Sequence, residues 1–195
     1  MSSSVSLPET PSFRLDGRRA LVTGASRGIG RAAAAALADA GAEVTLLARS
    51  GGELETVAEA IRIRGDRVQT LQLDVTKTAQ VNKEVAARGP FQILFNNAGA
   101  NRPAELLDIT EEDYDAVTDL NVRSAVFVAQ AVANGLIESH LPGSIINVSS
   151  QMGHVGGPKR TVYCATKHAI EGATKAMAWE LGEQNIRVNT ICPTF

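Results

Sequence analysis

The sequence predicts an α/β fold in which helices cover both faces of a parallel sheet. From Arg19 onward, short β-branched or aliphatic runs alternate with longer helical patterns, an order typical of consecutive βαβ units. Continuous apolar runs such as Ile93-Leu94-Phe95 indicate strands that are buried on both faces. Each connection between neighbouring parallel strands is expected to be right-handed.

The expected elements follow one another along the chain. We place strands near residues 19–23, 43–48, 67–73, 93–96, 144–148 and 187–191. We place helices at residues 29–40, 53–64, 78–88, 111–134 and 163–183. Gly41 stands where a glycine would end the first helix, and Thr110 stands at an N-cap position before acidic residues.

Length and composition exclude several classes of protein. A chain of 195 residues suffices for one well-buried domain, and 44% apolar with 21% charged residues is typical of a globular protein. A net charge of -2 without a basic run argues against a nucleic-acid partner. No stretch of about eighteen uncharged apolar residues occurs, which argues against a membrane span. Residues 1–12 have the composition of a flexible tail rather than a signal peptide, which leaves residues 13–195 as the domain.

The cysteine content argues against disulfide and metal sites. Cys164 and Cys192 are too few for a disulfide framework or a zinc quartet, so no metal is predicted. We expect both to be small buried hydrophobic residues in a reducing compartment, and the protein to be cytoplasmic.

A glycine-rich turn follows the first expected strand and opens the first helix. It reads Thr23-Gly24-Ala25-Ser26-Arg27-Gly28-Ile29-Gly30. In this setting the first glycine allows a sharp turn, the second lets the backbone approach a pyrophosphate, and the third lets the helix lie close to the sheet. The free N–H groups at the helix N-terminus favour phosphates. We therefore predict a dinucleotide site, against the alternative of a tight turn without a ligand.

The end of the second expected strand decides which dinucleotide is favoured. An acidic residue there would bind the ribose 2′-hydroxyl of NAD(H), but the strand ends Leu47-Ala48-Arg49-Ser50. The guanidinium of Arg49, like that of Arg27 in the glycine turn, suits the 2′-phosphate of NADP(H). NADP(H) is therefore favoured and NAD(H) stays possible. The alternative for Arg49 is a solvated charge at a strand end.

Tyr163 and Lys167 are four residues apart at the start of the last expected helix, so both project from one face. A phenol is a poor base at neutral pH, and a nearby ammonium together with a cationic nicotinamide favours its ionised form. The pair suits acid–base chemistry, or else the two residues are mere surface neighbours.

Hydroxyl residues end the fifth expected strand in Asn147-Val148-Ser149-Ser150. Open α/β sheets bind ligands at the carboxyl ends of their strands, so a serine here can hold a substrate oxygen. Serines at strand ends are also ordinary turn formers. The serine therefore becomes a candidate site residue only in combination with the tyrosine and lysine that follow.

Together these motifs resemble the classical short-chain dehydrogenase/reductase family, from about Leu15 to the end of the chain. The matching segments keep the family's order and approximate spacing: Thr23-Gly-x-x-x-Gly-Ile-Gly30, Asn96-Asn97-Ala98-Gly99, Leu120-Asn121-Val122, Ser150, Tyr163-x-x-x-Lys167, and Ile186-Arg187-Val188-Asn189 before Pro193. The resemblance implies a Rossmann-type doubly wound parallel sheet of strand order 3-2-1-4-5-6. The basic residues at 27 and 49 resemble the NADP-preferring branch.

The resemblance also implies four catalytic residues. Tyr163 would be the general acid/base, Ser150 would orient the carbonyl, and Lys167 would anchor the nicotinamide ribose and favour the ionised tyrosine. Asn121 would interrupt its helix and hold a water in a proton relay. The implied reaction is transfer of the pro-S hydride between NADP(H) and a carbonyl or secondary alcohol. The implied cofactor contacts are Gly24, Ser26, Arg27, Gly28, Ile29, Gly30, Arg49, Asp74, Val75, Asn97, Ala98, Gly99, Tyr163, Lys167 and Pro193.

The sequence departs from the family near its end. Thr194 stands where the family commonly has glycine, and the chain stops at Phe195, before the family's substrate-covering segment and last strand. We therefore expect a truncated domain whose sixth strand is an exposed apolar edge.

Substrate and assembly stay open at this point. The small-molecule substrate could be a 3-oxoacyl compound, a sugar or another ketone, and a homodimer or homotetramer is expected of a full-length chain. Two alternatives remain for function. One is a catalytically inactive cofactor-binding or interaction protein, and the other is an epimerase or dehydratase on the same scaffold.

Overall fold

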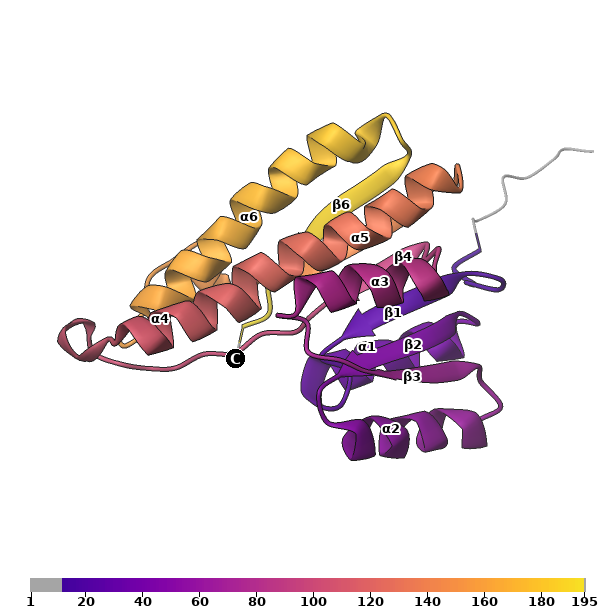
Figure 1. Cartoon of the computed structure of the whole chain (residues 1–195), viewed down its shortest axis with the longest axis horizontal. Coiled ribbons are helices and arrows are strands. Elements are labelled where there is room, and N and C mark those ends of the chain that lie inside the picture. Colours follow the sequence, from indigo (N-terminus) through magenta and orange to yellow (C-terminus); the bar gives the residue numbers. More distant parts are fainter. Residues whose placement is uncertain (1–11, 195) are drawn as a thin grey trace, which may run out of the picture.

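Six parallel strands form one sheet in the computed structural model, which describes residues 12–194 (Figure 1). The strand order is β3-β2-β1-β4-β5-β6, which confirms the predicted order. The strands are β1 (Arg19–Thr23), β2 (Glu43–Ala48), β3 (Val68–Gln72), β4 (Ile93–Asn96), β5 (Gly143–Val148) and β6 (Ile186–Ile191). The predicted tail at residues 1–12 lies outside the described residues except for Ser12, and so does Phe195.

Helices connect these strands. They are α1 (Gly28–Asp39), α2 (Gly51–Ile63), α3 (Thr78–Arg88), α4 (Glu111–Thr118), α5 (Ser124–Glu138) and α6 (Thr161–Gly182). Short 3-10 turns add Leu106–Asp108 and Gln151–Gly153. Predicted and observed boundaries agree within two residues, with one exception among the helices.

The exception is the helix predicted at residues 111–134. It is corrected to α4, a π-helical turn at Asp119–Arg123, and α5, which continues to Glu138. Its start is as predicted, because the Thr110 side chain accepts a hydrogen bond from the Asp113 backbone N–H at 3.1 Å.

One apolar layer holds α1 and α2 against the sheet. Ala34 of α1 and Leu54 of α2 belong to it, together with Ala20 and Val22 of β1 and Leu46 of β2. Because side chains alternate along a strand, the strand residues between the ones named here point to the opposite face of the sheet. The first layer therefore anchors the helix that begins at the glycine turn.

The second layer lies on the opposite face. Val85 of α3 and Val128 of α5 pack there against Leu21, Leu94 and Ile145 of the sheet. The α6 helix lies along β6 beside α5 on this face (Figure 1). This layer therefore fixes the helices that carry Asn121, Tyr163 and Lys167 relative to the strand ends.

In the described part of the chain, no helix covers the first face over β5 and β6. β6 is the edge strand, and its side chains alternate between burial against α6 and exposure on the other face. Ile146 and Val148 of β5 are half-buried on that open face, and Ile191 of β6 is 39% exposed there. The edge is therefore apolar in part, with Arg187 and Asn189 as its other exposed residues.

The prediction that both cysteines are buried is wrong. Cys192 is exposed and Cys164 is half-buried. Cys192 follows β6 at the edge of the sheet, where its thiol reaches Glu171 of α6 but the residue is not covered. The sequence pattern around it gave no indication of this exposure.

The helical run Glu111–Glu138 is long and apolar enough, by length and composition, to cross a membrane. The fold buries 50% of its most apolar window, where α5 packs against α3, β4 and β5. Core helices of globular proteins have the same composition, so packing against the sheet accounts for these apolar residues.

A buried network of amide and hydroxyl groups joins the carboxyl ends of three strands. Asn96 of β4 donates to Asn147 of β5 at 3.0 Å and to the Ala125 carbonyl of α5 at 2.8 Å. Asn147 donates in turn to the Thr174 hydroxyl of α6 at 3.0 Å, and the Thr23 hydroxyl of β1 donates to Asn96 at 3.3 Å. All four polar side chains are buried. We call this set the carboxyl-end network.

Replacing Asn147 tests the carboxyl-end network. Asn147→Leu keeps the side-chain size but leaves the Asn96 amide and the Thr174 hydroxyl each short of a buried partner. We expect the free energy of unfolding to fall by about 1–3 kcal/mol. Asn189→Leu, on the exposed face of β6, is the matched control and should change it by less than about 0.5 kcal/mol. Equal losses in urea unfolding would contradict the role given to the network.

Candidate active site

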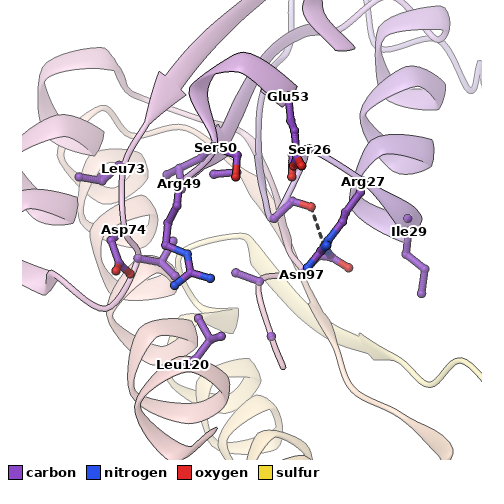
Figure 2. Close-up of a pocket in the computed structure, with 17 residues that line it drawn as sticks. Ser26, Arg27, Ile29, Arg49, Ser50, Glu53, Leu73, Asp74, Asn97 and Leu120 are labelled. Carbon is purple, nitrogen blue, oxygen red and sulfur yellow. Dashed lines mark hydrogen bonds between the residues drawn. The ribbon is translucent and has the colours of Figure 1, made fainter. Parts of the chain in front are cut away.

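A cavity of about 470 Å³ lies at the carboxyl ends of the strands, between the glycine turn and the ends of β2, β3 and β4 (Figure 2). Many predicted cofactor contacts line it: Gly24, Ser26, Arg27, Gly28, Ile29, Arg49, Asp74, Val75, Asn97, Ala98 and Gly99. Further lining residues were not predicted: Leu47, Ala48, Ser50, Glu53, Leu73 and Leu120. The only sequence signal for most of these is their place beside a predicted contact.

The glycine turn is shaped by positive φ and by close approach. Gly28 has a φ of 55°, a conformation that L side chains rarely adopt. A Cβ on Gly30 would lie 2.3 Å from the carbonyl oxygen of Gly24, so Gly30 lets α1 start close to β1 rather than lining the cavity. The N-terminus of α1 has no side-chain cap and no acidic residue in its first turn. Its backbone N–H groups are therefore available to an anion.

Thr23 and Asn97 tie the glycine turn to the end of β4. The Thr23 Oγ1 accepts hydrogen bonds from the backbone N–H groups of Asn97 and Ala98, both at 2.9 Å. The Asn97 amide donates to the carbonyls of Thr23 at 3.1 Å and Gly24 at 3.2 Å. These bonds hold the Asn97–Gly99 segment at the wall of the cavity.

Two arginines and two acidic residues, Asp74 and Glu53, give the cavity its charges. Arg27 and Arg49 both line it, and Asp74 lies near Arg49 (Figure 2). Burial opposes the ionisation of Asp74, but hydrogen bonds from Thr76 and the charge of Arg49 outweigh it, so the pKa of Asp74 lies below its usual value. The two bonds from Thr76 measure 3.0 Å from its N–H and 2.9 Å from its hydroxyl.

Ser150 and Tyr163 line a second pocket of about 210 Å³, which we call the small pocket. Its other walls are Asn101, Gln151, Met152, Arg160, Pro193 and Thr194. Ser150 follows β5, and its Oγ accepts a hydrogen bond from the Met152 N–H at 3.1 Å. Tyr163 comes from the first turn of α6. The structure thus brings together three predicted site residues from distant segments, the third being Pro193.

Lys167 lies one turn along α6 from Tyr163 and is only 6% exposed. Its Nζ donates to the Val148 carbonyl at 2.7 Å and lies 5.6 Å from the centroid of the Tyr163 ring. Burial lowers the pKa of Lys167 to about 8, against an opposing effect of Cys192. The ammonium form therefore predominates at neutral pH, beside the phenol.

Asn121 lies in the π-helical turn, which confirms the predicted interruption of its helix. Its Oδ1 accepts from the Ala100 N–H at 2.8 Å, and its amide donates to the Ala100 carbonyl at 2.9 Å. The amide also donates to the Thr166 hydroxyl at 3.1 Å. Asn121 therefore links the loop after β4 to α6, through a threonine that sequence reasoning missed.

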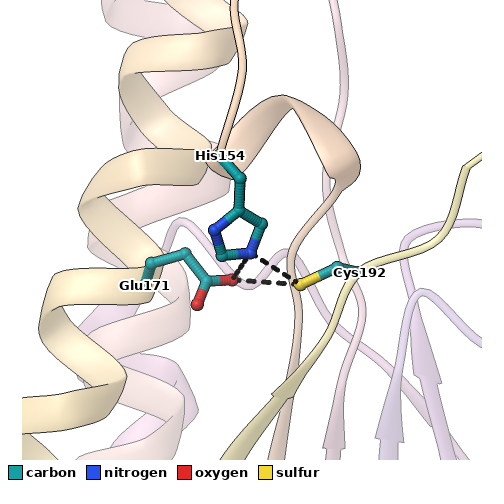
Figure 3. A group of neighbouring side chains, drawn as sticks. All are labelled: His154, Glu171 and Cys192. Atoms are coloured by element: carbon teal, nitrogen blue, oxygen red, sulfur yellow. Dashed lines mark hydrogen bonds and ion pairs between the residues drawn. The ribbon is translucent and has the colours of Figure 1, made fainter.

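His154, Glu171 and Cys192 meet near the small pocket, with their ligand-type atoms all within 4.8 Å of one another (Figure 3). The Cys192 thiol donates to Glu171 at 3.2 Å, and the His154 Nε2 lies 3.3 Å from the Cys192 sulfur. Burial and the neighbouring Glu171 raise the pKa of Cys192, so the thiol keeps its proton at neutral pH. A metal would have to displace that proton. As described, the three residues form a hydrogen-bonded cluster that ties α6 to the end of β6.

The buried ammonium predicts a pH-dependent component of stability. The pKa of Lys167 is about 8 in the fold and 10.5 ordinarily, so between these values the unfolded chain binds more protons and stability rises with pH. Relative to Lys167→Met, the wild type should gain up to about 1.4 kcal/mol per pH unit in this window. Urea unfolding across the window measures this, with Lys175→Met, at an exposed position of α6, as control. Parallel pH profiles for wild type and Lys167→Met would contradict it.

Comparison with known proteins agrees with this geometry. The family model for short chain dehydrogenase matches residues 18–195. D-erythrulose reductase of Gallus gallus is 42% identical over 184 residues, which cover 94% of this chain and 73% of that protein. L-xylulose reductase of Bos taurus is 41% identical over 182 residues, which cover 93% of this chain and 73% of that protein.

Solved structures show the same arrangement. A short-chain type dehydrogenase/reductase from Mycobacterium marinum is 37% identical with a TM-score of 0.91, covering 94% of this chain and 77% of that one. A gluconate 5-dehydrogenase from Burkholderia cenocepacia, in complex with NADP and tartrate, is 38% identical with a TM-score of 0.88, covering 93% of this chain and 72% of that one. The chain therefore belongs to the short chain dehydrogenase family.

Proposed function

We propose that the chain is an NADP(H)-dependent oxidoreductase that interconverts a small carbonyl compound and its secondary alcohol. The observation that carries this proposal is the meeting of Ser150 and Tyr163 in one small pocket. The chain segment that lines the larger cavity with Asn97, Ala98 and Gly99 reaches the small pocket two residues later, at Asn101. A cofactor in the cavity and a substrate in the pocket would therefore be neighbours.

The residues of the larger cavity fit a phosphorylated dinucleotide. The uncapped N-terminus of α1 offers N–H groups to the pyrophosphate, and Gly28 leaves open space where a Cβ would project. Arg27 and Arg49 offer cations to the 2′-phosphate, while Asp74 and Val75 lie where the adenine is expected. When bound, NADP(H) supplies or accepts the hydride. The gluconate 5-dehydrogenase neighbour, which holds NADP, supports this assignment.

In the small pocket, two hydroxyl groups act on the substrate oxygen. Because the Ser150 Oγ accepts its hydrogen bond from Met152, its own proton is available to the substrate carbonyl. Tyr163 delivers that oxygen its proton in reduction and removes it in oxidation. The fixed position of Ser150 after β5 then orients the carbonyl toward the phenol.

Lys167 and Asn121 support the tyrosine. The Lys167 ammonium has three N–H donors and uses one on the Val148 carbonyl, so two can hold the cofactor ribose. Its buried charge favours the ionised phenol. The Asn121 side chain is engaged with Ala100 and Thr166, so a relay water would bind main-chain groups of the π-helical turn.

The names of two relatives support a small hydroxylated ketone as the substrate. Two of them are named as reductases of erythrulose and xylulose, both ketoses. The polar walls of the small pocket, Asn101, Gln151 and Thr194, suit hydroxyl-bearing compounds better than a bare hydrocarbon ketone. We further propose that the protein is cytoplasmic and forms a homodimer or homotetramer.

Arg49→Asp tests the cofactor assignment. The substitution places an acidic group at the end of β2, where it would repel a 2′-phosphate and accept hydrogen bonds from a 2′-hydroxyl. We expect the ratio of kcat/KM for NADPH over NADH to fall by about 10- to 100-fold. Arg67→Asp, exposed outside the cavity, is the matched control. An unchanged ratio in Arg49→Asp would remove the basis for a 2′-phosphate site there.

Tyr163→Phe tests the proposed activity itself. Loss of a positioned acid/base typically costs about a hundredfold to ten-thousandfold in turnover. NADPH oxidation with whichever of erythrulose, xylulose and 5-keto-D-gluconate the wild type reduces fastest should fall by that amount, while NADPH binding, followed by fluorescence, should persist. The second tyrosine of the chain, Tyr114, is half-exposed on α4, and Tyr114→Phe should keep turnover. Near-normal turnover by Tyr163→Phe would defeat the assignment.

A further inference from the structure

The small pocket contains one residue that is charged at neutral pH. Among the described residues that line it, Arg160 is the only Lys, Arg, Asp or Glu. Arg160 immediately precedes α6, three residues before Tyr163. Nothing in the roles given to Ser150 and Tyr163 requires a cation at this position.

Two polar atoms in the walls of this pocket are buried and lack partners among the described residues. They are the Nη1 of Arg160 and the Oδ1 of Asn101. A buried donor or acceptor without a hydrogen bond is costly, and an unpaired charged group is more so. Both atoms therefore indicate groups that a ligand would supply.

Neighbouring cations already have partners. Arg102, next to Asn101, pairs with Asp113 at 2.5 Å. Lys159, next to Arg160, pairs with Glu105 at 3.3 Å. These pairs neutralise the two cations that are adjacent in sequence to Asn101 and Arg160, which leaves Arg160 as the basic residue of the pocket available to a ligand.

The two unpartnered atoms require different hydrogen-bonding partners. A guanidinium N–H donates, and its strongest partners are carboxylates and other anionic oxygens. A carbonyl oxygen such as Asn101 Oδ1 accepts, and a substrate hydroxyl can donate to it. One molecule that satisfies both atoms and also presents a ketone to Tyr163 is a hydroxylated keto acid.

We propose that Arg160 and Asn101 form a subsite for the carboxylate and a hydroxyl of the substrate, so that the small pocket selects hydroxylated keto acids over neutral ketones. The inference rests on the proposed function, because it uses the pocket in which Ser150 and Tyr163 act on the ketone. Arg160 is a specificity-determining residue in this scheme. It takes no part in proton transfer.

A charged substrate and its neutral counterpart test this subsite. 5-Keto-D-gluconate and its amide share the ketone and the hydroxyls and differ in charge. The wild type should favour the acid, and Arg160→Met should lower the ratio of kcat/KM for acid over amide by about 10- to 100-fold. Arg160→Lys should recover part of the ratio, because it restores the charge without the planar fork. Lys159→Met, the adjacent cation, is the matched control and should leave the ratio unchanged.

The outcomes separate this inference from the proposed function. If the wild type reduces the amide as well as the acid, or Arg160→Met keeps the wild-type ratio, the subsite is overturned while the oxidoreductase stands. If neither compound is reduced, the proposed activity on such ketones fails, and the subsite is decided by titrating D-gluconate and D-gluconamide. Stronger binding of gluconate that disappears in Arg160→Met supports the subsite. Equal binding of both compounds to both proteins overturns it.

Discussion

The carboxyl-end network is the constraint on which both pockets depend. The same Thr23 hydroxyl that donates to Asn96 also accepts from the N–H groups of Asn97 and Ala98. The hydroxyl that takes part in the buried network at the strand ends therefore also positions Asn97 and Ala98 in the wall of the larger cavity. Asn147 carries the network on to α6, the helix of Tyr163 and Lys167. Stability of the fold and alignment of the two pockets thus rest on shared atoms.

A buried ammonium at Lys167 is costly to the fold and useful to the site. Burial disfavours its charged form, as its lowered pKa shows, yet the Val148 carbonyl gives it a hydrogen bond at 2.7 Å. In a medium of low dielectric constant, a charge acts more strongly on a neighbouring group than it does in water. The same burial that weakens the fold therefore strengthens the effect of Lys167 on Tyr163.

Patterns within short stretches of sequence predicted the strands, most helices and the glycine turn. The features that were not predicted depend on contacts between residues far apart in the chain. Short β-branched or aliphatic runs placed β1, β2 and β4 to the residue, because such runs can be recognised without knowing which distant strand pairs with them. The π-helical turn depends on Asn121 binding Ala100 and Thr166, which are 21 and 45 residues away. Cys192 was expected to be buried as a small hydrophobic residue, but its exposure depends on how distant elements cover the end of β6. Likewise, no pattern in the sequence around Asn101 or Arg160 predicts that the two residues line the same pocket.

The charges of the larger cavity explain why two arginines serve the cofactor better than one. Asp74 lies near Arg49, and its lowered pKa keeps it ionised at neutral pH. Its negative charge offsets part of the attraction that Arg49 alone exerts on a 2′-phosphate. Arg27 lines the same cavity from the glycine turn and adds a second cation, while Glu53 adds a second acidic group, so the formal charges of the four groups cancel. Preference for the phosphorylated dinucleotide thus depends on both guanidinium groups, because removing either arginine leaves the formal charge of the cavity negative.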